Sequence, residues 1–217
     1  MHHGVFQGRL ADQQARRMLI LSESHHGDDK GKAASYTTAS VVEEDHIREC
    51  MHPFFSRIEQ SFGCECGNEP ARRDFWDRFY FGNYVDVLCG VRDDCARRMI
   101  KKNRQKYNDQ LFTFVNENGI DLIFCFSRLA YEKLPSLSRK DRADEYLETL
   151  PCQELLGKRR DYIARCRYLP DRAHGAVTVP LKKELLVYGL RHPSAAGGFR
   201  PGNYRDCLRE AAAFALV

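Results

Sequence analysis

Short apolar segments, separated by longer stretches with helical spacing, restrict the folds open to this chain more than any other feature. They lie at 18–21, 120–126 and 185–190, with a further one at 176–179. Each has the length of one strand, and strands that are apolar on both sides are typical of parallel sheets with both faces covered. We therefore predict an α/β fold, a three-layer α/β/α sandwich around a central, mostly parallel four-stranded sheet.

The stretches between these strands carry the signals of helices. Residues 41–62 have helical spacing, and Pro53 should kink that helix or split it in two. A helix is also predicted at 109–118, ending at Asn118-Gly119, and others follow at 127–134 and 204–216. Residues 138–172 are charged and mostly helical in pattern, whereas 28–40 has the composition of a loop.

The length of 217 residues favours one domain, 1–217, with a polar N-terminal extension at 1–17. A chain of this size buries enough surface to fold without a disulfide or a metal. No apolar run approaches the ~20 residues of a membrane span, and the N-terminus lacks a signal-peptide pattern. The nine cysteines are odd in number and several lie in apolar segments, so we expect free thiols, a cytoplasmic location and no membrane partner.

Positive charge is unevenly distributed, although the net charge is only +4. One cluster comprises Arg97, Arg98, Lys101, Lys102, Arg104 and Lys106. A second comprises Lys158, Arg159, Arg160, Arg165, Arg167 and Arg172. Such clusters are typical of a surface that binds a polyanion, and the alternative is a pair of solvated helix faces.

Polar turns follow the first and the last predicted strands. The first turn is Ser22-Glu23-Ser24-His25-His26-Gly27, and the last is His192-Pro193-Ser194. Sites in α/β sheets form beyond the carboxyl ends of the strands. Together with Phe81-Gly82-Asn83-Tyr84-Val85 and the strand at 120–126, this ordered set resembles the uracil-DNA glycosylase superfamily, most closely bacterial members whose first motif is Gly-Glu-Ser-His-Tyr. The resemblance spans residues 18 to 205.

The resemblance implies a monofunctional DNA glycosylase that binds DNA, flips out a base and hydrolyses its N-glycosidic bond, leaving an abasic site. Such a reaction needs charge stabilised at both ends of the breaking bond, because the sugar becomes cationic and the base anionic. The motifs contain no lysine that could form a Schiff base, so no strand-cleaving step is expected. We expect a monomer without a cofactor.

Catalytic roles follow the motifs. His192 resembles the family's histidine that donates to a carbonyl oxygen of the base. Ser194 resembles the family's serine that contacts a DNA phosphate. The alternative for His192 is that it caps the turn. Many family members have a carboxylate where this chain has Ser24, so we expect the adjacent Glu23 to orient water. Asp28 and Asp29 are further candidates, and the alternative for Glu23 is a structural carboxylate.

Base recognition is expected from the central motif and the first loop. Asn83 resembles the family's base-reading asparagine, because an amide both donates and accepts hydrogen bonds; a turn role is the alternative. His25 and His26 could contact the base or a phosphate. The stacking candidates are aromatic residues, which are more often core: Tyr36, which we prefer, Phe54 and Phe81.

Two departures bear on the substrate. The family's base-displacing leucine is Ala196 here, so Phe199 or Arg200 could take its place, and Arg191 and Arg200 would face DNA. The second departure is Ser24, where many family members have a carboxylate. Together the two departures favour a modified base as the substrate, such as glucosylated hydroxymethylcytosine in phage DNA, and hence a role in phage defence. The alternatives are a glycosylase-like nucleic-acid-binding protein without catalysis and a uracil or hypoxanthine repair glycosylase.

Metal ligation is a separate alternative. Zinc could bind Cys50, His52, Cys64 and Cys66, which would suit a hydrolase of a small nucleoside, but the spacing is tighter than in usual zinc sites. Some family branches carry an iron–sulfur cluster with ligands ahead of the first motif, and this chain has no cysteine before Cys50. We therefore predict no metal.

Overall fold

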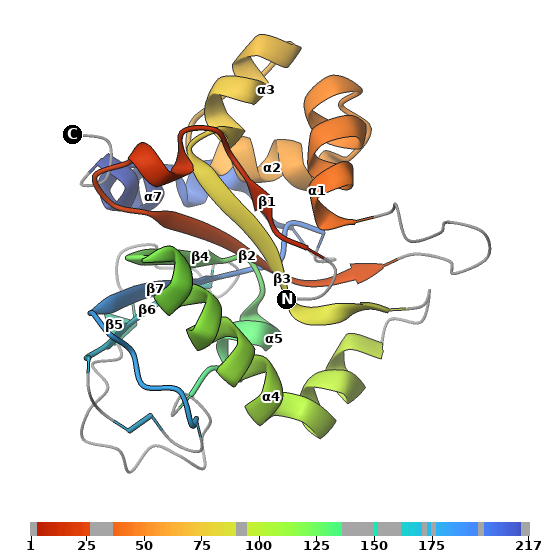
Figure 1. The fold of residues 1–217 in the computed structure, drawn as a ribbon. Coiled ribbons are helices and arrows are strands. Elements are labelled where there is room, and N and C mark those ends of the chain that lie inside the picture. The colour runs from red at the N-terminus through yellow and green to blue at the C-terminus, as the bar shows by residue number, and fades with distance from the viewer. Residues whose placement is uncertain are drawn as a thin grey trace.

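A sheet of seven strands organises the computed structural model, in the order β1-β3-β2-β4-β7-β6-β5. The structure describes residues 4–26, 37–89, 95–135, 150–151, 162–170, 173–174, 177–194 and 198–213. Helices lie on both faces of the sheet (Figure 1). The strands are β1 Phe6–Gln7, β2 Met18–His26, β3 Phe79–Cys89, β4 Leu122–Cys125, β5 Leu150–Pro151, β6 Ile163–Tyr168 and β7 Leu185–Leu190.

The α/β class is confirmed, but the prediction of a four-stranded, mostly parallel sheet is wrong. The four central strands of the observed sheet, β3, β2, β4 and β7, are parallel to one another. Antiparallel strands extend both edges, β1 beside β3 and β6 with β5 beyond β7. The sheet is therefore mixed.

Strand β6 lies where the sequence pattern predicted helix. Along Ile163–Tyr168 the buried residues are interrupted by Arg165 and Arg167, which are less buried. This alternation is the period of a strand with one face toward the core. Conversely, the described residues of the predicted strand at 176–179, residues 177–179, form no strand.

Two cores, one on each face of the sheet, explain why the central strands are apolar throughout. In β2, Met18 and Ile20 belong to the core under one helical layer, and Leu19 and Leu21 to the core under the other. The first layer contains α1 Thr38–Ser40, the π-helix η2 Val41–Arg48, α2 Pro53–Ser61, α3 Glu69–Trp76 and α7 Arg205–Ala213. The second contains α4 Cys95–Asn118 and α5 Arg128–Tyr131.

Local signals explain the helix boundaries. Pro53 is the first residue of α2, so it separates α2 from η2 instead of kinking one helix. Helix α4 ends at Asn118 as predicted, and Gly119 follows with a φ of +58° that favours glycine. Helix α4 nevertheless begins well before residue 109, at Cys95.

The N-terminal segment is part of the fold, not a polar extension. Strand β1 pairs with β3, and the Gly8 N–H donates to the Phe79 carbonyl at 3.0 Å. Ala11, in the 3₁₀ helix η1 Ala11–Gln13, is fully buried. A Cβ on Gly8 would lie 2.3 Å from the Trp76 carbonyl oxygen, so only glycine fits at this crossing.

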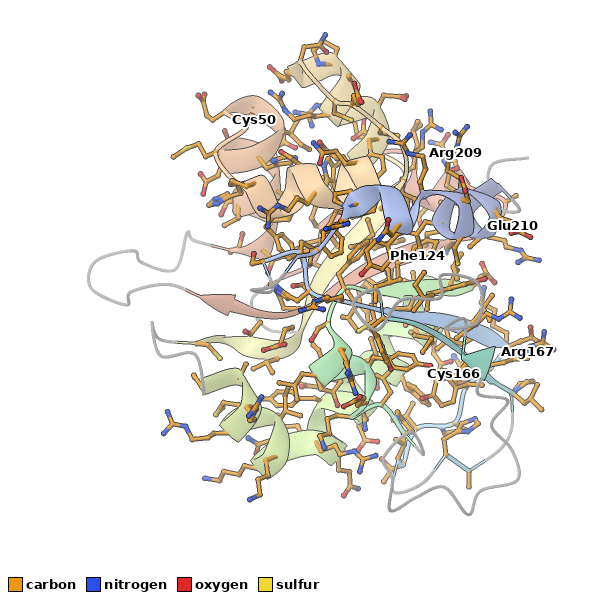
Figure 2. All side chains as sticks on the ribbon, turned by 180° about the vertical axis from the view of Figure 1, so that it is seen from behind. Cys50, Phe124, Cys166, Arg167, Arg209 and Glu210 are labelled. Carbon is orange, nitrogen blue, oxygen red and sulfur yellow. The ribbon has the colours of Figure 1, made fainter. Side chains whose placement is uncertain are left out.

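Buried and exposed cysteines are distributed through the fold. The eight cysteines of the described segments are free thiols, with Cys166 buried and Cys50 exposed. Figure 2 shows Cys50 at the periphery and Phe124 between the sheet and its helices. Within the described ranges, no helix is both long and apolar enough to cross a membrane.

Candidate functional site

A cavity of about 210 Å³ opens where the central strands end. It lies beyond the paired residues Leu21 and Cys125, where β2 and β4 separate. Its polar lining comes from five parts of the fold, namely Ser22 and Ser24, Thr38, His52, Asn83, and His192 with Ser194. The carboxyl ends of parallel strands meet at one edge of the sheet, so residues far apart in sequence gather here.

The strand order explains the position of this cavity. Strand β2 is first among the four parallel strands, and the next two, β3 and β4, lie on either side of it. The connections therefore leave in opposite directions and open a crevice at the carboxyl end of β2. Ser22 and Asn83 are register partners across β2 and β3 at this point.

His192 follows β7 and is held by its own turn. The Ser194 N–H donates to Nδ1 of His192 at 3.2 Å. In the neutral ring, the hydrogen is therefore on Nε2, which makes that nitrogen a donor. The Phe54 ring packs 5.1 Å from the imidazole, centroid to centroid. Arg57 of α2 donates from Nη1 to the Pro193 carbonyl at 2.6 Å, which anchors the turn to the helical layer.

Asn83 and Ser24 extend the polar wall from the sheet. Asn83 is only 9% exposed, and its Nδ2 donates to Thr38 Oγ1 at 3.2 Å. Thr38 is held at the start of α1 by a capping box between Thr37 and Ser40. The amide of Asn83 is thus oriented at the edge of the cavity. Ser24 is 8% exposed and borders the same space.

Glu23 lies on the other face of β2 and is not among the residues that line this cavity, so its expected role with water stays a prediction. Side chains alternate along a strand, so Ser22 and Ser24 border the cavity while Glu23 lies on the α5 side. Ser127 Oγ donates to Glu23 Oε2 at 2.7 Å and accepts the Ala130 N–H at 3.1 Å. Glu23 therefore supports the N-cap of α5, the structural role that the sequence left open.

Aromatic side chains form the apolar part of the cavity. Phe54, Phe55 and Phe81 line it together with Val41. Phe81 is also core, since it is nearly fully buried and packs on Phe55 at 5.2 Å. Phe54 is half-buried and contacts both His192 and Phe81.

The structure contradicts Phe199 as a DNA-inserting residue. Its ring is 8% exposed and stacks on Tyr204 at 4.8 Å, beside Phe126. It could not enter DNA without leaving the core. Arg200 and Ser194 are exposed and Arg191 is half-buried.

Several candidates lie outside the part of the chain that the structure describes. These are Asp28, Asp29, Tyr36 and Ala196, and also Lys158, Arg159, Arg160 and Arg172 of the second basic cluster. His25 and His26 belong to β2, but their side chains are outside the described atoms. The roles expected of them stay predictions.

The zinc set is not assembled. Among the described residues, no group of three potential ligands is close enough to hold a metal. Cys50 lies beside Ser56, and His52 borders the cavity. Cys66 hydrogen-bonds Cys64 and thereby lowers the pKa of the Cys64 thiol to about 7.

His52 is a site residue that the motifs did not indicate. It borders the cavity, and its Nε2 lies 3.4 Å from Asp45 Oδ2. The sequence indicates His52 only as a possible metal ligand, because no local pattern relates it to Asp45. The two meet through the turn that connects η2 to α2.

The first basic cluster lies on α4, near the same end of the sheet. Helix α4 begins shortly after β3 ends, so its first turns lie near the carboxyl ends of β2 and β3 (Figure 1). Its exposed cations are Arg97, Arg98, Lys101, Lys102 and Lys106. Arg104 is structural instead, since it donates to the Lys133 and Leu134 carbonyls at 2.8 and 3.1 Å.

Neither a comparison with protein-family models nor a search of curated proteins finds a match to this chain.

Proposed function

We propose that this protein is a DNA glycosylase that receives a flipped, modified base in the cavity and hydrolyses its N-glycosidic bond. The observation that carries the proposal is the position of His192, whose Nε2–H is a donor in a cavity that also contains the oriented Asn83 amide. The three-layer α/β/α arrangement expected from the sequence is part of this proposal, and helices on both faces of the sheet support it.

The size of the cavity suits one ring. Its ~210 Å³ is below the roughly 300–1,000 Å³ of typical small-molecule sites. An intact nucleotide cofactor would need more space, whereas a base brought in from DNA does not. A substituent as large as a sugar on that base would extend out of the cavity.

The polar groups suit the leaving base. Negative charge develops on the base as the bond breaks, and a donor preorganised for that charge typically accelerates a reaction about 10²–10³-fold. His192 supplies the donor, and the Asn83 amide can both donate to and accept from the edge of a pyrimidine. The rings of Phe54 and Phe81 provide apolar walls.

Charge around the site suits DNA. The exposed cations of α4 and Arg200 could contact phosphates, which gives affinity without sequence preference. No lysine is among the described residues that line the cavity, which favours hydrolysis by water over a Schiff base.

The decisive experiment is a substrate screen. Purified protein is incubated with genomic DNAs that carry different natural base modifications, and with duplexes that contain uracil, hypoxanthine, hydroxymethylcytosine or glucosylated hydroxymethylcytosine. We expect abasic sites in at least one modified DNA. His192→Ala, purified identically, excludes a contaminating enzyme, and Lys182→Ala, at an exposed position away from the cavity, is the matched control. A folded wild-type protein that releases no base from any DNA contradicts the proposal.

One observation favours a second candidate, a glycosylase-like protein that binds nucleic acid without catalysis. The described residues that line the cavity include no carboxylate that could act on water or on the sugar. Binding that weakens with salt, without release of any base, would support this candidate.

A further inference from the structure

The turn between η2 and α2 has an unusual backbone. Cys50 has a φ of +55°, a left-handed conformation that is strained for any residue with a Cβ. Cys50 follows the π-helix η2. A π-helix is a rare conformation, and where it does occur it is often at a functional site. The Cys50 N–H donates to the His46 carbonyl at 2.9 Å and the Met51 N–H to the Asp45 carbonyl at 2.8 Å. The chain thereby folds back, and His52 comes to lie beside Asp45.

Buried contacts hold this turn in place. His46 is fully buried, with Nε2 2.6 Å from Glu59 Oε1, and Trp76 Nε1 donates to the same oxygen at 2.7 Å. Arg72, also buried, donates to the Ile47 and Arg48 carbonyls at 2.8 and 3.1 Å. These two carbonyls belong to the last residues of η2. The strain at Cys50 is therefore maintained by packing, as expected where a position serves the site.

The His52–Asp45 pair has the arrangement of an oriented base. The two side chains are 36% and 31% exposed, so water reaches them. Because the Asp45 carboxylate accepts from Nε2, the basic nitrogen of the neutral ring is Nδ1. The separation of 3.4 Å is long, but catalytic hydrogen bonds are often long before substrate binds. The ring is positioned against Phe55, 6.0 Å away.

Hydrolysis at this site needs a group that takes a proton from water. Glu23 lies on the other face of β2, and Ser24 cannot act as an anionic base. Nδ1 of His192 already accepts the Ser194 N–H. Among the described residues that line the cavity, His52 is the side chain with an unprotonated nitrogen and a carboxylate behind it.

We propose that His52, oriented by Asp45, is the general base for the attacking water; this rests on the proposed glycosylase function. Nδ1 takes one proton from water as its oxygen bonds to the anomeric carbon. The electron pair of the C–N bond leaves with the base, where the His192 Nε2–H meets the negative charge. The released nucleobase then takes up the proton from His52. Water is thus added across the bond, with OH on the sugar and H on the base.

The test is single-turnover base release on the substrate identified by the screen. We expect His52→Ala and His52→Gln to lower the rate about 10²–10⁴-fold while DNA affinity changes less than about twofold. Imidazole in the buffer should restore part of the rate to His52→Ala but not to His192→Ala. Asp45→Asn should retain more activity than His52→Ala. Glu49→Gln, an exposed change in the same turn, is the matched control and should behave as wild type.

The two proposals fail in different ways. If wild-type protein releases a nucleobase and His52→Gln, with an unchanged melting temperature, releases it equally fast, then His52 is not the general base. The glycosylase proposal stands in that case. A rate loss that imidazole does not restore, accompanied by weaker DNA binding, likewise overturns the assignment of His52 as the base. If the wild type releases no base from any DNA, both proposals fall.

Discussion

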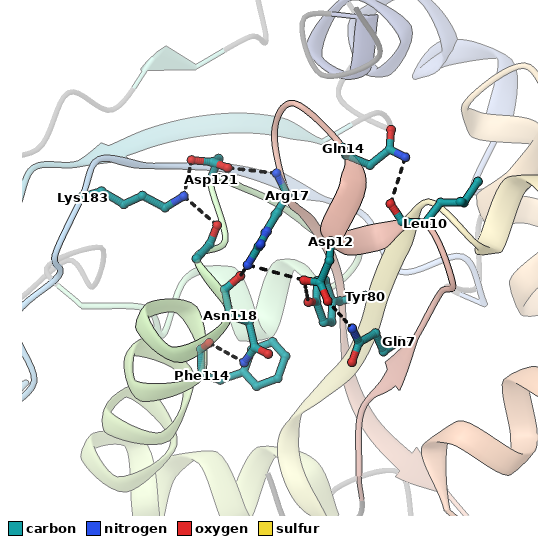
Figure 3. Close-up of polar contacts among 11 residues, drawn as sticks. Gln7, Leu10, Asp12, Gln14, Arg17, Tyr80, Phe114, Asn118, Asp121 and Lys183 are labelled. Carbon is teal, nitrogen blue, oxygen red and sulfur yellow. Dashed lines mark hydrogen bonds and ion pairs between the residues drawn. The ribbon is translucent and has the colours of Figure 1, made fainter.

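The two ends of the central sheet use similar residues in opposite ways. At the amino ends of β2, β4 and β7, charged and amide side chains bond to one another and to the backbone (Figure 3). At the carboxyl ends, polar side chains surround a cavity. The first end holds the strands in register, and the second presents groups to a ligand.

The network at the amino ends is densely paired. Asp121 accepts the Arg17 N–H at 2.9 Å and also binds the Lys183 ammonium. Arg17 Nη1 donates to the Asn118 carbonyl at 2.8 Å, and Lys183 Nζ to the Gly119 carbonyl at 2.6 Å. Asp12 accepts from the Tyr80 hydroxyl, and burial together with that contact raises the pKa of Tyr80 to about 12.

The comparison separates the residues that stabilise the fold from the residues that are available for function. Polar groups that satisfy one another contribute to the free energy of unfolding, whereas groups arranged for a ligand contribute little until it binds. Substitutions at the two ends should therefore affect different measurements.

Among the substitutions that compare the two ends of the sheet, the largest effect is expected from His192→Ala. Loss of the Nε2–H donor should lower base release about 10²–10³-fold. The melting temperature should stay within about 2 °C of wild type, because His192 is half-buried and bonds within its own turn. Single-turnover assays and calorimetry measure the two quantities, and a large drop in melting temperature would place His192 with the structural end instead.

Asp121→Ala should give the opposite pattern. The Arg17 N–H and the Lys183 ammonium lose their shared acceptor, which should lower the free energy of unfolding by about 1–3 kcal/mol. For a domain of this size, that is roughly 2–4 °C per kcal/mol in melting temperature. Base release per folded molecule should not change; if it falls in proportion, the two ends are coupled.

Glu23→Ala distinguishes the two roles considered for Glu23. Removing the acceptor of the Ser127 hydroxyl should cost about 0.5–1.5 kcal/mol of stability and leave base release within about twofold of wild type. Urea unfolding and single-turnover rates measure the two effects. A loss of activity comparable with that of His192→Ala would show that Glu23 reaches the reaction centre.

The smallest effect concerns Glu43, on the π-helix that carries Asp45. Its hydrogen bonds with Arg73, at 2.6 and 2.7 Å, lower the pKa of the Glu43 carboxyl. A carboxyl with a lowered pKa in the folded state stabilises at pH values above its unfolded pKa and loses that contribution as pH falls through the folded one. Glu43→Gln should therefore cost under about 1 kcal/mol at pH 7. The difference from wild type should vanish in acid; a difference that persists there contradicts the ion pair.

Much of the site could be predicted because parallel strands place their ends together. The apolar segment at 18–21 begins β2, the segment at 120–126 contains β4, and the segment at 185–190 forms β7. The polar residues that follow these apolar segments in β2 and after β7 meet at one cavity. Asn83, named from the central motif, lies there too. Pro53 and Gly119 marked helix boundaries, because their backbone restrictions are local.

Side-chain direction and distant contacts were decided only by the tertiary structure. Glu23 and Ser24 are neighbours in sequence, yet the alternation of β2 places them on opposite faces, and motif order does not show which face borders the cavity. Phe199 is buried because Tyr204 and Phe126 surround it, a contact that no local pattern reveals.

The sequence by itself determined the α/β class, three of the four central strands (β2, β4 and β7) and the edge of the sheet where a site would form, because hydrophobic periodicity and strand ends are local properties. Only the tertiary structure decided the antiparallel edge strands and the pairing of His52 with Asp45. The physical reason is that these depend on how the chain returns on itself. The left-handed residue Cys50 and the buried His46–Glu59 pair hold that return in place.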